Sequence, residues 1–422
     1  MRATAGEYGR LRDGSNPRRT LTFFHSESER SSMNLTGEQR AVRDVVREFA
    51  VEEIQPVARE ADESGEFPED VWDGLAELDL TGLTTPPEYG GYGADRTTYA
   101  VVNEQLAYGS LAVATALSVH CLATSCIASF GGEAQKERWL PEMAEGRPVG
   151  AFALSEPGAG SNPAEMTTEA RPVEGSDGDV GSYVIDGEKQ WITNGERAGV
   201  IVLFAKTDRS DPDSITQFVV PADAEGVTVG KTEDKMGLRA SDTAALQFDG
   251  VEIPAENRLT EEGAGLRAAL SILTGGRIGI AAQSVGLAQD AFDRAREYAT
   301  EREQFGRPIG DIQTIRHKLA EMATRIHAAR ALTYDAAGAA ERGREQSLYD
   351  PAMLASMAKY VASETAVDVT NEAVQIHGGY GYVTEFDVER LYRDAKVTTI
   401  YEGTSEIQKT VIARHLIGER GE

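Results

Sequence analysis

The hydrophobic periodicity of the chain changes twice, and this limits the possible folds more than any other feature of the sequence. Before Ala151, apolar residues recur at spacings of three and four, as in "PEDVWDGLAELDL", which is typical of amphipathic helices. From Ala151 to Pro254 the segments are short and β-branched or alternating, which indicates strands. Helical spacing returns after Pro254. We therefore predict a multidomain α+β protein with an N-terminal helical domain, a middle antiparallel β-domain and a C-terminal four-helix bundle.

The domain limits follow from the same changes. We place the helical domain at residues 33–150, the β-domain at residues 151–256 and the bundle at residues 257–422. Residues 1–32 contain basic residues but lack the apolar core of a signal peptide, so we expect them to form a disordered tail. A helix with Thr36 as its cap is expected to follow this tail.

Strands and bundle helices are predicted at specific places. Strand-like runs occur in "GSYVIDGEKQWITNG", "GVIVLFAKTD", "ITQFVVPAD" and "DTAALQFDGVEIP". In the last run, Ala244, Leu246 and Phe248 should share one face of the strand. Apolar stripes at residues 278–295 and 315–329 predict helix packing faces. No GxGxxG motif follows a strand, so a nicotinamide-binding Rossmann domain is not expected.

Charge excludes one class of partner. The net charge is −27, from 69 acidic against 42 basic residues, and only nine of the basic residues are lysines. Such a surface repels phosphate backbones, so we expect no nucleic acid as a partner. An acidic, lysine-poor surface also suits a cytosol of high salt, where screening lowers the cost of self-repulsion, and we therefore expect a halophilic source.

Cysteine content and hydropathy give two further expectations. Cys121 and Cys126 are the only cysteines and lie in one helical segment, which argues against a disulfide framework or a cysteine metal site. We expect no metal and a reducing, cytoplasmic location. No apolar run is expected to reach the roughly 20 residues of a membrane span.

The segment "IYEGTSEIQ" at residues 400–408 places the carboxylate of Glu402 between Tyr401 and Gly403. Ser405 and Gln408 have the spacing of a capping box, so the start of the last helix does not require Glu402. The residues alone leave two interpretations. Glu402 is either an incidental surface charge or a base held in a partly apolar site.

Five motifs, in this order, resemble those of the acyl-CoA dehydrogenase family: "FALSEPGAGSN" (152–162), "WITNG" (191–195), "REQFGRPI" (302–309), "QIHGGYG" (375–381) and "IYEGTSEIQ". The resemblance covers about residues 35–416, and the helical–β–helical order is the architecture of that family. It implies FAD-dependent dehydrogenation of acyl-CoA thioesters to trans-2-enoyl-CoA in fatty acid β-oxidation. It also implies that the electrons pass to an electron-transfer flavoprotein.

The resemblance assigns two segments to the flavin ring. The loop from Phe152 would lie against the ring, with Ser155 near its pyrimidine edge, and Ser161 would also reach the thioester. Trp191 would pack on the flavin, and Thr193 would donate a hydrogen bond near N5. The implied contacts are Phe152, Ala153, Leu154, Ser155, Ser161, Trp191, Ile192 and Thr193.

Two more segments imply a cofactor shared between subunits. By itself Arg302 is a solvated charge at a helix end, whereas the resemblance makes it a clamp on the pyrophosphate. The "QIHGGYG" segment should form a helix C-cap with Gly378 in the left-handed αL conformation, and by resemblance it approaches the adenosine. A shared FAD implies a homotetramer. The remaining implied FAD contacts are Arg302, Phe305, Gln313, Gln375, Ile376, His377, Gly378, Gly379, Thr404, Ser405 and Glu406.

The family takes its base either from the Tyr-Glu-Gly stretch or from the position before the arginine of a "GRIGIA"-like segment. The second position is Gly276 in this chain, so the resemblance implies that Glu402 abstracts the α-proton. Burial should raise the pKa of Glu402, and a nearby helix N-terminus should oppose that shift. Thr274 stands where many members have an aspartate. The implied substrate contacts are Ser161, Thr274, Arg277 and Gly403.

Two other functions remain open at this level. An acyl-CoA oxidase of the same fold would reoxidise its flavin with oxygen, but such chains are usually longer. A flavin-binding scaffold without turnover is the other alternative, and the intact Glu402 argues against it.

Overall fold

The structure is a computed structural model that describes residues 35–176 and 178–418. The expected tail at residues 1–32 therefore lies outside the described residues. From Thr36 onward the chain forms one compact unit.

The N-terminal region is helical, as predicted. Thr36 caps the first helix in a capping box with Gln39, in which each side chain accepts a hydrogen bond from the other residue's backbone N–H. The helices are α1 (Gly37–Phe49), a π-helical turn (Ala50–Ile54), α2 (Gln55–Ser64), α3 (Glu69–Glu77), α4 (Arg96–Gly109), α5 (Leu111–Phe130) and α6 (Glu133–Ala144).

Helix α5 corrects one expectation from the sequence. Its 20 residues are long and apolar enough to cross a membrane by length and composition, so the prediction that no run is long enough was wrong. Most of its apolar window, 83%, is buried inside the protein. The helix packs against α4, the long helix α7 (Gly265–Glu301) and the first strand of the sheet. A helix buried on several sides has this composition for packing reasons alone.

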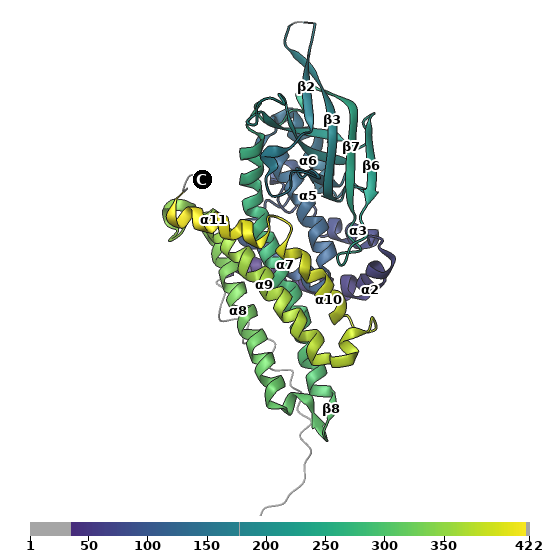
Figure 1. Cartoon of the computed structure of the whole chain (residues 1–422), viewed down its shortest axis with the longest axis vertical. Helices are drawn as coiled ribbons and strands as arrows, with labels where there is room; N and C mark the ends of the chain where they lie inside the picture. Colours follow the sequence, from purple (N-terminus) through teal and green to yellow (C-terminus); the bar gives the residue numbers. More distant parts are fainter. Residues whose placement is uncertain (1–34, 177, 419–422) are drawn as a thin grey trace, which may run out of the picture. The chain divides into compact units, whose positions relative to one another are not determined.

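The middle region is a sheet of seven strands: β1 (Gly150–Ala153), β2 (Glu169–Glu174), β3 (Val180–Thr193), β4 (Val200–Lys206), β5 (Ile215–Pro221), β6 (Val227–Thr232) and β7 (Thr243–Pro254). The order is β1-β4-β2-β3-β7-β6, with β5 paired to β4. Most ladders are antiparallel, as predicted, but β1 and β2 each pair in parallel with β4. Apolar residues of α5 and α6 pack on β4 in one core cluster (Figure 1).

The predicted faces of β7 are confirmed. Leu246 and Phe248 are buried, whereas Gln247 and Asp249 between and beyond them are exposed. Ala245, predicted for the outer face, is also buried, because it packs beside Gly230 of β6. Buried and exposed residues therefore alternate from Leu246 to Asp249, where only one face of β7 is covered, but not at Ala244 and Ala245, which are both buried.

The C-terminal region consists of long helices with short connections. In addition to α7 it contains the β8–β9 hairpin (Glu303–Gln304 and Arg307–Pro308), α8 (Gln313–Arg342), α9 (Pro351–His377), α10 (Val388–Ala395) and α11 (Ser405–Ile417). Short 3-10 turns lie between them, including η6 (Ile309–Asp311), η8 (Gly378–Tyr382) and η9 (Lys396–Thr399). Helices α7, α8 and α9 pack along one another (Figure 1).

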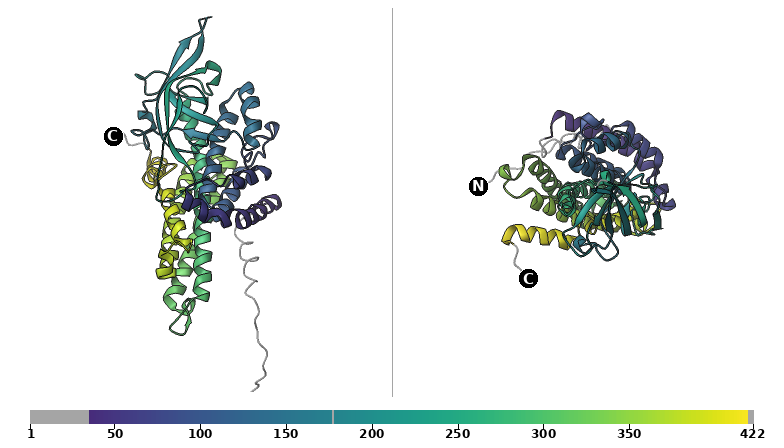
Figure 2. Two further views of the ribbon diagram at one scale, coloured as in Figure 1. Left: turned by 90° about the vertical axis from the view of Figure 1, so that its right-hand side faces the viewer. Right: turned by 90° about the horizontal axis from the view of Figure 1, so that it is seen from above.

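Most residues of the predicted packing stripes are buried, as Ile278, Val285 and Met322 show. Phe292, Ile315 and Leu319 of the same stripes are half-buried. The N-terminal helices pack against the bundle through contacts of α4 with α7 and α8. The turned views show the purple N-terminal helices beside the green helices of the bundle (Figure 2). The start of α7 reaches β5, where a side chain at Gly265 would meet the backbone of Thr216 at 2.8 Å. Helix α7 therefore links the sheet to the bundle.

Candidate active site

The Glu402 loop joins η9 to α11 and has an unusual backbone. Both Glu402 (φ 54°) and Gly403 (φ 88°) lie in the left-handed region. A non-glycine residue there is strained, and such strain is concentrated at functional sites. A Cβ at position 403 would lie 2.7 Å from Nε2 of Gln408. Glycine is therefore required at position 403 by the backbone itself.

The cap of α11 differs from the prediction. Thr404 is the N-cap, and its Oγ1 accepts a hydrogen bond from the N–H of Ile407 at 3.3 Å. The proposed capping box of Ser405 and Gln408 was therefore wrong. Gln408 instead turns back and donates from Nε2 to the carbonyl oxygens of Glu402 (3.0 Å) and Gly403 (2.9 Å). Ser405 is buried and donates to the carboxylate of Glu364 at 2.6 Å.

Lys359 of α9 holds the same loop from the other side. Its side chain is fully buried, and Nζ donates to the carbonyl oxygen of Gly403 at 2.8 Å. Burial lowers the pKa of Lys359 to about 8, although the nearby Glu402 and Glu364 oppose the shift. Lys359 and Gln408 together fix two consecutive carbonyl groups, so the strained turn is held in one geometry.

Glu402 is half-buried, and its carboxylate makes no ion pair among the described residues. Its Oε2 is inaccessible to solvent and has no hydrogen-bond partner among the described residues. Oε2 lies against α7, where a Cβ on Gly276 would be only 2.9 Å away. Burial raises the pKa of Glu402 to about 7, against the opposing charges of Arg277 and Lys359. A buried, unpaired carboxylate is costly, so this arrangement favours a base in an enclosed site over an incidental surface charge.

Two predicted substrate contacts lie on the same helix. Arg277 is buried and its Nε also has no hydrogen-bond partner in the described part of the chain. Burial lowers the pKa of Arg277, and the charge of Glu402 opposes this. Thr274, one turn earlier and half-buried, donates from Oγ1 to the carbonyl oxygen of Leu270 at 3.2 Å. The oxygen of Thr274 can still accept a hydrogen bond from a ligand.

The predicted flavin face is built around a bulge in β3. The β3–β7 register shifts between Lys189 and Ile192, and Trp191 there has a φ of 63°. The indole of Trp191 is turned out and 60% exposed, whereas Ile192 is buried in the sheet core. Any contact of Ile192 with a ligand would therefore come from its backbone. A strained bulge that exposes a large aromatic ring suits a planar ligand.

The loop after β1 lies next to this bulge. The N–H of Gln190 donates to the carbonyl oxygen of Ser155 at 2.9 Å. Of the predicted contacts in this loop, Ser161 is exposed, Phe152 and Ser155 are half-buried, and Ala153 and Leu154 are buried.

A buried ion pair that the motifs did not indicate fixes this loop. Lys189 Nζ lies 2.8 Å from Glu156 Oε1, and both side chains are nearly inaccessible. The backbone N–H groups of Thr167 and Thr168 also donate to the Glu156 carboxylate, at 2.6 and 3.0 Å. Burial raises the pKa of Glu156, but Lys189 and these donors outweigh it and lower the pKa to about 2.

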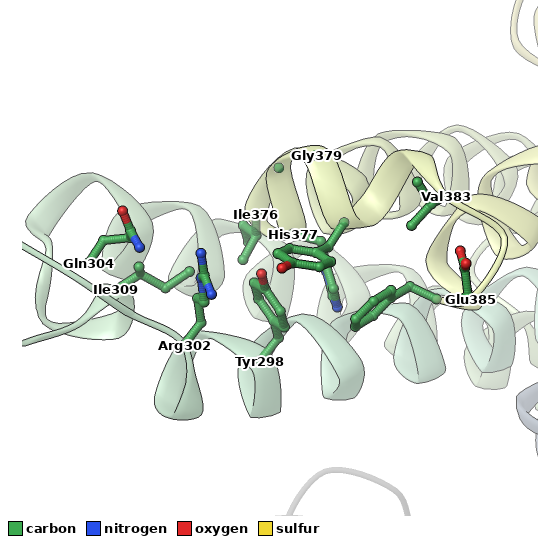
Figure 3. Close-up of a pocket in the computed structure, with 12 residues that line it drawn as sticks. Tyr298, Arg302, Gln304, Ile309, Ile376, His377, Gly379, Val383 and Glu385 are labelled. Atoms are coloured by element: carbon green, nitrogen blue, oxygen red, sulfur yellow. The ribbon is translucent and has the colours of Figure 1, made fainter.

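A second set of predicted residues lines a cavity of about 800 Å³ between the end of α7 and the end of α9 (Figure 3). Tyr298 and His377 are stacked there, with their ring centroids 4.3 Å apart. The guanidinium carbon of Arg302 lies 5.3 Å from the ring centroid of Tyr380. Cations and flat aromatic surfaces of this kind suit a ligand that carries both phosphate and a planar ring. The predicted contacts included Arg302, Ile376, His377, Gly378 and Gly379. They did not include Tyr298 and Phe386, which lie outside the motifs, or Tyr380, which lies inside the "QIHGGYG" motif.

The segments around this cavity have exposed, irregular backbone. Gly378 ends α9 as predicted, but its φ of 62° is combined with a ψ of −134°, so the expected αL conformation was wrong. Phe305 forms the tip of the β8–β9 hairpin with a φ of 55°, and it is 91% exposed. Gln313 and Gln375 are exposed, at the start of α8 and near the end of α9.

The two sets of predicted residues do not meet within one chain. Lys359, beside Glu402, and His377, beside Arg302, both belong to α9 and are 18 positions apart. At the rise of an α-helix they lie roughly 27 Å from each other along its axis. Thr404 and Glu406, predicted for the cofactor, belong with Glu402, with Thr404 half-buried and Glu406 exposed.

Comparison with known proteins covers nearly the whole described chain. Three family profiles match it: acyl-CoA dehydrogenase N-terminal domain (residues 36–147), middle domain (151–251) and C-terminal domain (263–417). An acyl-CoA dehydrogenase of Bacillus subtilis is 44% identical over 391 residues, which are 92% of this chain and 100% of that protein.

Solved structures agree with the profiles. A chain from the electron transferring flavoprotein structure of Acidaminococcus fermentans has a TM-score of 0.87 at 40% identity and covers 92% of this chain and 100% of its own length. Butyryl-CoA dehydrogenase of Megasphaera elsdenii has a TM-score of 0.86 at 41% identity, covering 91% and 99%. A glutaryl-CoA dehydrogenase of Mycobacterium smegmatis, in complex with FADH2, has a TM-score of 0.84 at 30% identity, covering 92% and 96%.

Proposed function

Because the chain belongs to the acyl-CoA dehydrogenase family of FAD-dependent oxidoreductases acting on CH–CH groups, we propose that it converts acyl-CoA thioesters to trans-2-enoyl-CoA with Glu402 as the base. The observation that carries this proposal is the carboxylate of Glu402, whose Oε2 is inaccessible to solvent and has no hydrogen-bond partner among the described residues. Its pKa of about 7 is close to a neutral working pH, where a general base is most effective.

Activation of the substrate requires a donor for the thioester carbonyl oxygen. The backbone N–H groups of Ile400 and Tyr401 donate to the carbonyl oxygen of Val397, whereas that of Glu402 has no partner among the described backbone hydrogen bonds. A preorganised donor of this type stabilises negative charge as the α-proton leaves. The loop that carries the base would thus also polarise the carbonyl group.

The rest of the machinery positions the ligands. Bound FAD supplies the acceptor for the hydride that leaves the β-carbon. We assign the exposed Trp191, with Thr193 and the loop from Phe152 to Ser161, to its ring system. Arg277 and Thr274 on α7, Ser161 and Gly403 are assigned to the acyl-CoA.

We also propose a homotetramer in which the second cavity serves a neighbouring subunit. The separation of roughly 27 Å along α9 argues against both sets of residues holding the same end of one cofactor. The nearly fully exposed Phe305 supports this proposal, because a large apolar side chain at a hairpin tip gains free energy when a partner covers it.

An electron-transfer flavoprotein is the proposed physiological acceptor. Its support is the likeness to a chain in the electron transferring flavoprotein structure of Acidaminococcus fermentans. The similarity to butyryl-CoA dehydrogenase supports a short acyl group.

Anaerobic titration of the purified, FAD-loaded protein with a panel of acyl-CoA thioesters tests the function. We expect flavin absorbance to bleach with a C4 to C6 thioester and to recover on addition of electron-transfer flavoprotein. Rapid recovery in air alone would identify an oxidase, and failure to bleach with every thioester despite bound FAD would identify a scaffold without turnover.

A further inference from the structure

Thr193, which is assigned to the flavin ring, lies between two irregular points at the end of β3. The register with β7 shifts between Lys189 and Ile192, and Asn194, directly after Thr193, has a left-handed φ of 61°. Beyond the shift, Ile192 and Thr193 are the last residues of β3 that pair with β7. Because a bulge disrupts the ladder locally, other contacts must fix the orientation of Thr193.

The side chain of Asn194 supplies such contacts. It is fully buried, and its Nδ2 donates to the carbonyl oxygens of Ala116 in α5 (2.9 Å) and Gly150 in β1 (3.1 Å). Only the NH2 end of an amide can bind two carbonyl oxygens, so the surroundings determine its orientation. The other end, Oδ1, has no hydrogen-bond partner among the described residues. An unpaired buried acceptor costs free energy, and the two bonds of Nδ2 offset this cost.

The two acceptors of Asn194 belong to a closely packed part of the protein. Gly150 also donates from its N–H to Nδ1 of His120 in α5 at 2.9 Å. A Cβ on Gly150 would lie 2.6 Å from the Cβ of Ala123, so β1 is packed directly against α5. Ala116, His120 and Gly150 are all buried. Asn194 therefore ties the turn after β3 to a unit of α5 and β1 that leaves little room for movement.

The Glu402 loop contacts the same helix one residue earlier. The hydroxyl groups of Tyr401 and Thr115 each lie 3.4 Å from Oε1 of Gln283 in α7, and 3.4 Å from each other. Gln283 is held in turn by α5, because its Nε2 donates to the carbonyl oxygen of Ala114 at 3.1 Å. Neighbouring residues of α5 thus contact the residue before the proposed base and the residue after the proposed flavin contact.

We propose that Asn194 is a positioning residue for the dehydrogenation. It fixes the Thr193 turn on α5 and thereby sets the distance between the flavin ring and the carboxylate of Glu402. This inference rests on the proposed function. Asn194 itself gains or loses no proton or electron, because the α-proton passes to Glu402 and the β-hydride to the flavin.

The reaction makes this distance important. The proton and the hydride leave adjacent carbon atoms of one substrate, so the base and the flavin must both lie at bonding distance from that pair of atoms. A displacement of about 1 Å at one of the two groups can slow such a reaction about 100-fold. A turn that is held through α5, which also contacts Tyr401, keeps the flavin side in register with the base.

Asn194→Gly tests the inference, because glycine keeps the left-handed backbone and removes both hydrogen bonds. The FAD-loaded variant and the wild type are compared in anaerobic flavin reduction by butyryl-CoA. The limiting rate should fall about 10- to 100-fold, whereas the half-saturating concentration should change less than about threefold because the proposed substrate contacts on α7 are untouched. The visible absorption spectrum of the oxidised flavin should also shift, since Thr193 moves relative to the ring.

Asn257→Gly is the matched control. Asn257 is also buried, and its Nδ2 donates to the carbonyl oxygen of Val219 in β5 at 2.9 Å. The control therefore loses the same kind of hydrogen bond in the same sheet region, away from the residues assigned to FAD. It should lower the melting temperature but leave the limiting rate and the flavin spectrum as in the wild type.

An Asn194→Gly variant with the rate and spectrum of the wild type would overturn the inference, as would a loss of rate no larger than that of Asn257→Gly. If Asn194→Gly does not fold with FAD, Thr115→Val decides, because it removes the contact of α5 with Tyr401 and keeps the side-chain shape. It should lower the limiting rate about three- to tenfold, and an unchanged rate would overturn the inference. Wild-type flavin that no acyl-CoA reduces would instead refute the proposed function, while the spectral comparison would still test the role of Asn194.

Discussion

Two glutamates, Glu156 in the sheet and Glu402 in the bundle, each have a carboxylate oxygen enclosed by the protein and a buried lysine nearby. The two neighbourhoods differ in the atom to which the lysine donates a hydrogen bond. In the sheet, Lys189 lies 2.8 Å from Glu156. In the bundle, Lys359 donates to the carbonyl oxygen of Gly403, and the Glu402 carboxylate has no ion pair in the described part of the chain. The pKa of Glu156 falls to about 2, whereas burial raises that of Glu402 to about 7.

The difference shows that residue type and burial do not decide between a structural and a reactive carboxylate. Both glutamates pay for desolvation, which raises a carboxyl pKa. Glu156 recovers that cost through the ammonium group and the amides of Thr167 and Thr168, so it stays ionised and fixes the loop after β1. Glu402 has an oxygen without a hydrogen-bond partner and a pKa of about 7, so its carboxylate is available to accept a proton near neutral pH.

The largest effect is expected for Glu402→Gln. Glutamine keeps the shape of the side chain but cannot act as a base, so the rate of flavin reduction by a C4 acyl-CoA should fall about 100- to 10,000-fold or more. Anaerobic single-turnover reduction measures it, and FAD content serves as the control because Lys359 and Gln408 still hold the loop. Reduction at close to the parent rate would mean that Glu402 is not the base.

The corresponding substitution in the sheet, Glu156→Gln, should lower the free energy of unfolding rather than the rate of flavin reduction. Glu156→Gln leaves the Lys189 ammonium buried without a counter-charge, which should cost about 3–5 kcal/mol of unfolding free energy. Denaturant unfolding measures this, and the double variant Glu156→Gln with Lys189→Met should recover much of the loss because no uncompensated charge remains. A loss below about 1 kcal/mol in the single variant would contradict the structural role.

A smaller effect is expected from Lys359→Met, which tests whether the charge of Lys359 lowers the pKa of Glu402. Only ionised Glu402 accepts a proton, so the wild-type rate should fall as the pH drops through about 7. Lys359 lowers the pKa of Glu402, so its removal should move this inflection to higher pH by about one unit or less. The pH profile of flavin reduction measures the shift. Lys409→Met, which removes an exposed lysine of α11, should leave the inflection in place.

The sequence motifs identified Glu402 as the proposed base, but they did not show that Glu156 has an ion pair with a lysine and Glu402 has none among the described residues. The order of helices and strands, the Thr36 cap and the faces of β7 were all predictable, since periodicity and capping are local properties of the chain. Lys359 gave a weak signal, because it is a single lysine in an alanine-rich helical segment of a lysine-poor chain. Lys189 gave none, since it stands among the polar residues Glu188 and Gln190 of the predicted strand.

The sequence by itself determined the succession of helical, β and helical regions and the position of Glu402 in its Tyr-Glu-Gly stretch. Only the tertiary structure decided that Gly276 of α7 faces that carboxylate and that Lys359 donates to Gly403. The physical reason is that periodicity records which face of an element is buried, whereas the pKa of a buried group depends on partners from distant elements. Arg277 and Lys359, the charges that act on Glu402, come near it only when α7, α9 and the Glu402 loop pack together.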